Sequence, residues 1–95
     1  MNFGVIIEAL RNNKCATRLS WKDGIFVFKQ VPSIISNEII PKMQSVPDSA
    51  KCLLLSYDQD SIHYNNQIVI VNNRNIDSWN PTPDDLFAED WVIVK

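Results

Sequence analysis

The sequence predicts an α+β fold, with a mainly antiparallel β-sheet, an N-terminal helix and a short late helix. Three observations carry this prediction: an amphipathic stripe near the N-terminus, short apolar or alternating runs between polar turns, and one strongly capped segment near the C-terminus. The 95 residues predict a single domain over 1–95 with a small core. We therefore expect assembly as a homo-oligomer to supplement that core.

The first element is a helix that begins near Phe3 and is capped by Asn2. Its apolar positions follow the i, i+3, i+4, i+7 spacing of one helix face: Phe3, Ile6, Ile7 and Leu10. Asn12 and Asn13 end the helix, because asparagine tolerates the left-handed conformation found past a helix C-terminus.

A β-hairpin is expected next. Strands over 15–21 and 25–31 flank a turn over 22–24, which contains an Asp-Gly pair, a strong hairpin signal. Pro32 is expected to end the second strand, since proline has no N–H to donate.

The middle of the chain carries weaker signals. One helical turn is expected over 36–40, followed by Pro41, which argues against a longer helix. A turn is expected over 47–49, and a strand over 51–57 because its three consecutive leucines resemble a fully buried strand. A polar loop over 58–61 follows.

The last third alternates between strands and asparagine-rich turns. The expected strands cover 62–64, 67–71, 76–79 and 91–94, and the expected turns cover 65–66 and 72–75. Between the last two strands, Thr82 is the expected N-cap of a short helix and Pro83 suits its first position. Asp85 stands where its carboxylate can return a hydrogen bond to the cap, and Trp79 and Trp91 flank the segment.

Composition excludes several classes of function. A net charge of −2 without a Lys/Arg cluster argues against a nucleic acid polymer as partner. The apolar runs are too short to span a membrane, and the N-terminus lacks the basic and apolar regions of a signal peptide. Cys15 and Cys52 are expected to be reduced, partly buried thiols of a cytosolic protein, although a single disulfide between them stays open.

The sequence favours a binding protein over an enzyme, with no cofactor. His63 is the single histidine, and with two glycines the chain cannot build a glycine-rich phosphate loop. A Cys/His pair assembled in space is left open. An acidic cluster could hold a cation, but it is better explained by its place at a helix start, so no metal is expected: Asp84, Asp85, Glu89 and Asp90.

Aromatic side chains near turns point to a nucleotide. A tryptophan close to Arg18 could stack a purine while the arginine pairs with phosphate. The polar residues of the capped segment could receive base or ribose hydroxyls, although capping alone also explains them. Phe28 and Trp91 are expected to be core residues. The predicted ligand-binding residues are Arg18, Trp21, Phe26, Trp79, Asn80, Thr82 and Asp85.

Two groups of residues resemble a known family. They are Met1-Asn2-Phe3-Gly4 with Glu8-Ala9-Leu10 and Arg18-x-x-Trp21, and the late Trp79-x-x-Thr82-x-Asp84-Asp85-Leu86-x-Ala88-Glu89-Asp90-Trp91. In order and spacing they resemble the Thoeris anti-defence type 2 proteins, which are small phage-encoded sponges. The resemblance covers roughly the first thirty and the last twenty residues. The segment over 33–61 departs from the family pattern.

The resemblance implies a non-enzymatic protein that binds the glycocyclic ADP-ribose signal of Thoeris immunity and holds it intact. It also implies a second site for the cyclic dinucleotides of CBASS, a homotetramer with ligand sites between protomers, and a place in the cytoplasm of the infected bacterial host.

Two other functions stay open. An interaction module could block a host protein through an apolar patch formed by Ile34, Ile35, Ile39 and Ile40. A cyclic nucleotide hydrolase could use His63 or the acidic cluster.

Overall fold

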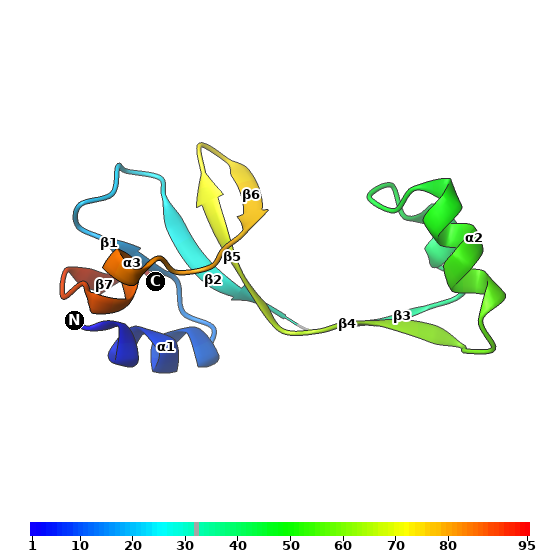
Figure 1. Cartoon of the computed structure of the whole chain (residues 1–95), viewed down its shortest axis with the longest axis horizontal. Coiled ribbons are helices and arrows are strands. Elements are labelled where there is room, and N and C mark those ends of the chain that lie inside the picture. The colour runs from blue at the N-terminus through cyan, green and yellow to red at the C-terminus, as the bar shows by residue number, and fades with distance from the viewer. Residues whose placement is uncertain (32) are drawn as a thin grey trace. The chain divides into compact units, whose positions relative to one another are not determined.

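The computed structural model describes residues 1–31 and 33–95, which form two compact units (Figure 1). Unit 1 comprises Met1–Gln30 and Asn66–Lys95, and unit 2 comprises Val31–Asn65. Whether the chain acts as a single domain stays a prediction. The expected end of a strand at Pro32 lies outside the described residues.

Unit 1 contains a five-stranded antiparallel sheet in the order β6-β5-β2-β1-β7, which confirms the predicted fold class. Its strands are β1 (Ala16–Arg18), β2 (Phe26–Gln30), β5 (Gln67–Asn72), β6 (Asn75–Ser78) and β7 (Trp91–Ile93). β1 and β2 form the predicted hairpin, and Gly24 has the positive φ of 87° that its turn requires. The first strand was predicted to continue to residue 21, but it ends at Arg18 because residues 19–21 turn away.

Helix α1 (Phe3–Arg11) lies along this sheet and contacts β1, β2 and β7 (Figure 1). The Asn2 side chain accepts a hydrogen bond from the Val5 N–H at 3.0 Å, and Asn13 is left-handed, so both predicted ends are confirmed. The predicted stripe faces the core, whose buried members are Phe3, Ile6, Leu10, Ala16, Val27 and Trp91.

The short helix α3 (Pro83–Phe87) begins with the predicted capping box. The Asp85 N–H donates to Thr82 Oγ1 at 3.2 Å, and the Thr82 N–H donates to Asp85 Oδ2 at 2.9 Å. Two helix-start donors are therefore satisfied reciprocally, which fixes where the helix starts.

Unit 2 pairs β3 (Ser33–Ser36) with β4 (Ser61–Tyr64), and helix α2 (Asp48–Ser56) contacts the 3-10 turn η1 (Ile40–Lys42). β4 confirms the expected strand there, whereas β3 was not anticipated. The helical turn expected over 36–40 is wrong, since a turn follows β3 and η1 begins only at Ile40.

The strand predicted over 51–57 is also wrong, because α2 covers residues 51–56. Leucine is a strong helix former, and no β-branched residue occurs within the helix. Pro47 and Asp48, taken as a turn, instead stand at the N-cap and the first position of α2.

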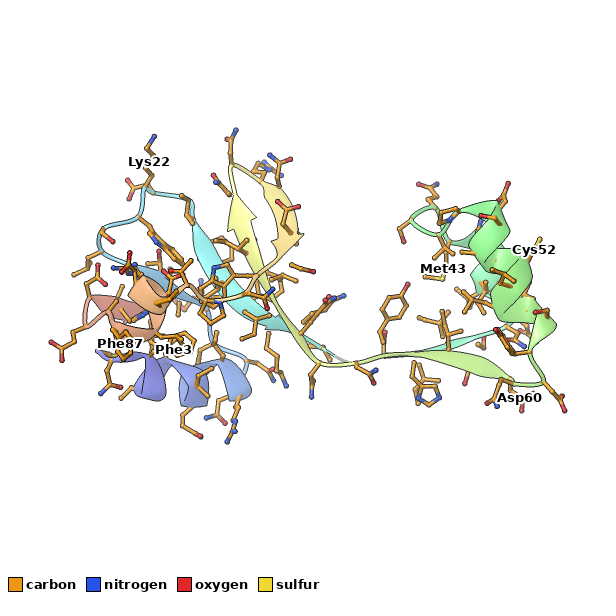
Figure 2. The ribbon with its side chains drawn as sticks, in the orientation of Figure 1. Phe3, Lys22, Met43, Cys52, Asp60 and Phe87 are labelled. Atoms are coloured by element: carbon orange, nitrogen blue, oxygen red, sulfur yellow. The ribbon has the colours of Figure 1, made fainter. Side chains whose placement is uncertain are left out.

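Unit 2 buries little apolar surface by itself. Ile40 is fully buried, but Ile34 and Leu53 are 68% and 63% exposed. Cys52 is exposed on α2 (Figure 2) rather than partly buried as predicted, whereas Cys15 is half-buried, and both are free thiols. The expected patch of four isoleucines is interrupted, since Ile40 belongs to the interior of the unit.

Candidate functional site

A two-carboxylate clamp on Arg18 joins the first strand to the late helix. Arg18 Nη1 donates to Asp85 Oδ1 at 3.0 Å, and Arg18 Nε donates to Asp90 Oδ1 at 2.9 Å. The Arg18 and Asp85 side chains are only 18% and 8% exposed, so this pair is largely shielded from water. We call Arg18, Asp85 and Asp90 the arginine clamp.

The ion pair between Arg18 and Asp90 shifts the pKa of both groups. The hydrogen bond to Asp90 raises the pKa of Arg18 above its ordinary value, with Asp85 adding to the effect against the cost of desolvation. The same bond from Arg18 lowers the pKa of Asp90 below that of an ordinary carboxyl group. Both shifts favour the charged forms, so Arg18 and Asp90 are ionised at neutral pH.

Asp90 also holds the backbone that leads to Trp21. Its Oδ2 accepts from the Ser20 N–H at 3.1 Å, and its carbonyl accepts from the Leu19 N–H at 3.0 Å. The Trp21 N–H in turn donates to the Arg18 carbonyl at 3.0 Å. The turn after β1 is therefore tied to the start of β7.

All three tryptophans meet next to the clamp in one aromatic cluster, formed by Phe3, Trp21, Trp79 and Trp91. The ring of Trp21 lies edge-on to Trp91 at 5.2 Å and to Trp79 at 6.2 Å between centroids. Trp91 is fully buried, as predicted, and its Nε1 donates to the Asp85 carbonyl at 2.9 Å. Trp21 and Trp79 are half-buried, so each keeps one part of its ring accessible.

A cavity of about 410 Å³ opens beside Trp21, along the β1–β2 connection. We call it the hairpin cavity. It brings together three of the seven predicted ligand-binding residues, Arg18, Trp21 and Phe26. Its full lining is Thr17, Arg18, Leu19, Trp21, Lys22, Asp23, Gly24, Ile25, Phe26 and Val94.

Phe26 also belongs to the sheet face opposite α1. It alternates along β2 with Val27, which is buried, and its ring lies 6.2 Å from that of Phe28. Phe28 was predicted to be a core residue but is only half-buried. Cross-strand pairing places Val69, Val71 and Ile76 on the same outer sheet face as Phe26 and Phe28, and of these only Val69 is buried.

The other four predicted residues do not line the hairpin cavity. Trp79 packs in the aromatic cluster, Thr82 and Asp85 form the capping box, and Asn80 is exposed. Their roles toward a ligand stay predictions. Sequence reasoning missed Lys22 and Asp23 as lining residues, although the Asp-Gly signal already placed them in the turn beside Trp21.

The residues weighed for chemistry are not among those that line this cavity. His63 is exposed on β4 of unit 2, where it pairs with Ile34. Two carboxylates of the acidic cluster, Asp85 and Asp90, are engaged by Arg18. Over residues 1–31 and 33–95, no three His, Cys, Asp or Glu side chains gather in a way that could hold a metal ion.

A second cavity of about 310 Å³ lies in unit 1 between α1 and the strands β2 and β5. Ile7, Leu10 and Ile68 supply apolar lining, and Arg11 and Lys29 supply positive charge. Glu8 pairs with Arg11 at 3.0 Å, but that pair is well exposed.

Comparison with known proteins gives one clear result. The sequence model of one family, described as Tad2-like, Thoeris anti-defense 2-like domain, matches residues 1–94. No curated protein matches the chain. In the part of the chain that the structure describes, no helix has the length and apolarity needed to cross a membrane.

Proposed function

The chain belongs to the Tad2-like family of Thoeris anti-defense 2-like proteins, and from this premise we propose that it sequesters the glycocyclic ADP-ribose signal of Thoeris immunity without cleaving it. The hairpin cavity is the observation that carries this proposal. Its volume falls in the range of small-molecule sites, and Trp21 and Phe26 offer aromatic surface for a purine. Such a protein would act in the cytoplasm of the infected bacterial host.

Sequestration without cleavage is supported by the lining of the cavity. The cavity holds no histidine, and its one carboxylate within the described residues is Asp23, on an exposed turn. Holding a ligand requires a preformed site, because a mobile one loses affinity to ordering costs. The arginine clamp and the edge-on tryptophans provide that rigidity.

Self-association as a homotetramer is the second part of the proposal. The outer sheet face exposes apolar side chains, with Ile76 62% exposed, and unit 2 exposes Leu53 and Tyr57 at 63% and 66%. Surfaces of this kind mark protein interfaces. Because Phe26 belongs to both the outer sheet face and the hairpin cavity, a partner on that face would close the cavity.

A second ligand class is favoured by the cavity between α1 and β5. Its lining combines the cations of Arg11 and Lys29 with apolar side chains. Such a lining suits a ligand with phosphate groups and flat bases, so we propose it as the site for cyclic dinucleotides of CBASS. Lys29→Gln should weaken that binding and leave glycocyclic ADP-ribose binding unchanged.

The first experiment is to mix purified protein with glycocyclic ADP-ribose, remove unbound signal, and then denature the protein by heating. Release of intact signal supports sequestration, whereas a converted product supports the hydrolase alternative. If a host protein is retained in a pull-down whether or not the nucleotide is present, the interaction module is favoured instead.

A matched pair of variants locates the site. Phe26 and Phe28 lie on the same face of β2 and are both half-buried, but only Phe26 lines the hairpin cavity. Phe26→Leu should weaken glycocyclic ADP-ribose binding by at least about fivefold, the lower end for losing one base-stacking ring. Phe28→Leu should bind as the wild type does. Equal effects of both variants in calorimetric titration would place the ligand elsewhere.

A further inference from the structure

The hairpin cavity has an unexpected charge distribution. Arg18 is the cation that sequence reasoning assigns to the ligand, yet it is already bound by Asp85 and Asp90 at 3.0 and 2.9 Å. Two carboxylates against one guanidinium leave the arginine clamp with an excess of negative charge. The clamp therefore repels a phosphate group rather than attracting it.

Lys22 is the other cation that lines the cavity. It is exposed and makes no ion pair with any carboxylate of the described residues. It projects from the connection between β1 and β2 (Figure 2). Its charge is free to meet an anionic group that enters the cavity.

The backbone around Lys22 is held in place. The Ile25 N–H donates to the Lys22 carbonyl at 3.3 Å, and Thr17 Oγ1 donates to the Ile25 carbonyl at 2.6 Å. Gly24 supplies the positive φ that this turn requires. The base of the Lys22 side chain is thus fixed beside the cavity, while its ammonium group can adjust to a ligand.

We propose that Lys22 offsets the negative charge of the bound ligand, and that Arg18 is a positioning residue whose clamp holds Trp21 at the cavity wall. This proposal rests on the proposed function, because it divides the roles at the same site. Asp23 neighbours Lys22 on the cavity rim and opposes an anion there. The two exposed side chains therefore have opposite effects on a phosphate-bearing ligand.

The test uses two probes that share adenosine. Glycocyclic ADP-ribose also carries a charged diphosphate and a second ribose, whereas adenosine itself is uncharged. Lys22→Gln should weaken glycocyclic ADP-ribose binding about fivefold, the upper end for an exposed ion pair, and should leave adenosine binding unchanged. Asp23→Asn should tighten glycocyclic ADP-ribose binding by roughly twofold. Raising the salt concentration should weaken wild-type binding of this probe more than that of the Lys22→Gln variant.

Lys14→Gln is the matched control, since Lys14 is an exposed lysine of unit 1 that does not line the cavity. This variant also removes one positive charge, and it should change neither the affinity for glycocyclic ADP-ribose nor that for adenosine. If Lys14→Gln and Lys22→Gln weaken binding equally, the charge effect is non-specific and the assignment of Lys22 is wrong.

Arg18→Lys tests the positioning role, because a lysine cannot bridge two carboxylates as a guanidinium does. Positioning predicts that both probes lose affinity by the same factor. Loss for glycocyclic ADP-ribose alone would make Arg18 a direct phosphate contact, and no loss for either would make the clamp purely structural. Each of these two results overturns the assignment of Arg18.

Binding by the wild type distinguishes a failure of the proposed function from a failure of the role given to Lys22. A wild-type protein that binds neither probe refutes the proposed function and the role of Lys22 with it. If the wild type and the Lys22→Gln variant bind glycocyclic ADP-ribose with equal affinity, only the role of Lys22 is refuted.

Discussion

Replacing Asp85 by asparagine tests how much the arginine clamp contributes to stability. The Asp85 carboxylate accepts from one donor at each oxygen: Oδ1 accepts from the Arg18 guanidinium at 3.0 Å, and Oδ2 accepts from the Thr82 N–H at 2.9 Å. An asparagine side chain has nearly the same shape but one oxygen. Its amide NH₂ must therefore face one of the two donors, and that donor loses its acceptor.

The cost follows from burial and charge. A hydrogen bond to a charged group contributes about 1.5–3 kcal/mol, and Asp85 is 6% exposed, so water replaces the lost acceptor poorly. Asp90 continues to bind Arg18 Nε, which keeps the loss below that of a fully broken buried pair. We expect Asp85→Asn to lower the free energy of unfolding by about 2 kcal/mol, or the melting temperature by roughly 10 °C.

The assay is urea denaturation followed by tryptophan fluorescence, because the aromatic cluster reports directly on unit 1. Asp84→Asn is the matched control: Asp84 lies in the same helical turn but is exposed, so its loss should cost less than about 1 kcal/mol. The urea midpoint should fall without a change in slope. If the two variants have the same midpoint, the clamp contributes nothing beyond helix-end charge.

Three further predictions concern stability. Thr82→Ala removes one half of the capping box and should cost about 1 kcal/mol in the same urea assay, whereas Thr82→Ser should keep most of it. Gly24→Ala should cost about 1 kcal/mol from the positive φ alone, because no atom lies within 4 Å of an added Cβ; a neutral result would show that this turn relaxes. The lowered pKa of Asp90 means that its ion pair stabilises the fold above the ordinary carboxyl pKa of about 3.9 and is lost as the pH falls below it. Urea midpoints of the wild type and of Asp90→Asn should therefore differ at pH 7 and converge in acid. Plots of the two midpoints against pH that stay parallel would contradict this role. The raised pKa of Arg18 affects the pH dependence of stability only above the ordinary arginine range.

Local signals predicted unit 1 well. The cap at Asn2, the stripe of α1 and the capping box at Thr82 each depend on residues within seven positions of one another, and all three are confirmed. Unit 2 was predicted poorly because its elements bury few side chains, so no periodic pattern marks them. The leucines of α2 illustrate this, since a run of apolar residues indicates burial in a strand only when a core exists to receive it.

Only those parts of the candidate site that are close in sequence could be predicted. Trp21 and Phe26 stand within six positions of each other, and the hairpin brings them together. The ion pairs of Arg18 span 67 and 72 positions in sequence, so no local pattern reveals that its charge is already engaged. Lys22 was passed over because an exposed lysine in a turn carries no signal until the cavity beside it is seen.

The chain leaves the sheet for unit 2 and returns from it at two residues that are paired with each other. Gln30 at the end of β2 is the direct cross-strand partner of Gln67 at the start of β5. A two-residue turn could join these strands as an ordinary hairpin with the same register, so the segment between them is an insert that the sheet does not need. Insertions are tolerated at such points, and their length and composition can drift over evolutionary time while the rest of the sheet keeps its pairing. An inhibitor built in this way can acquire new recognition surfaces without rebuilding the pocket that it already has.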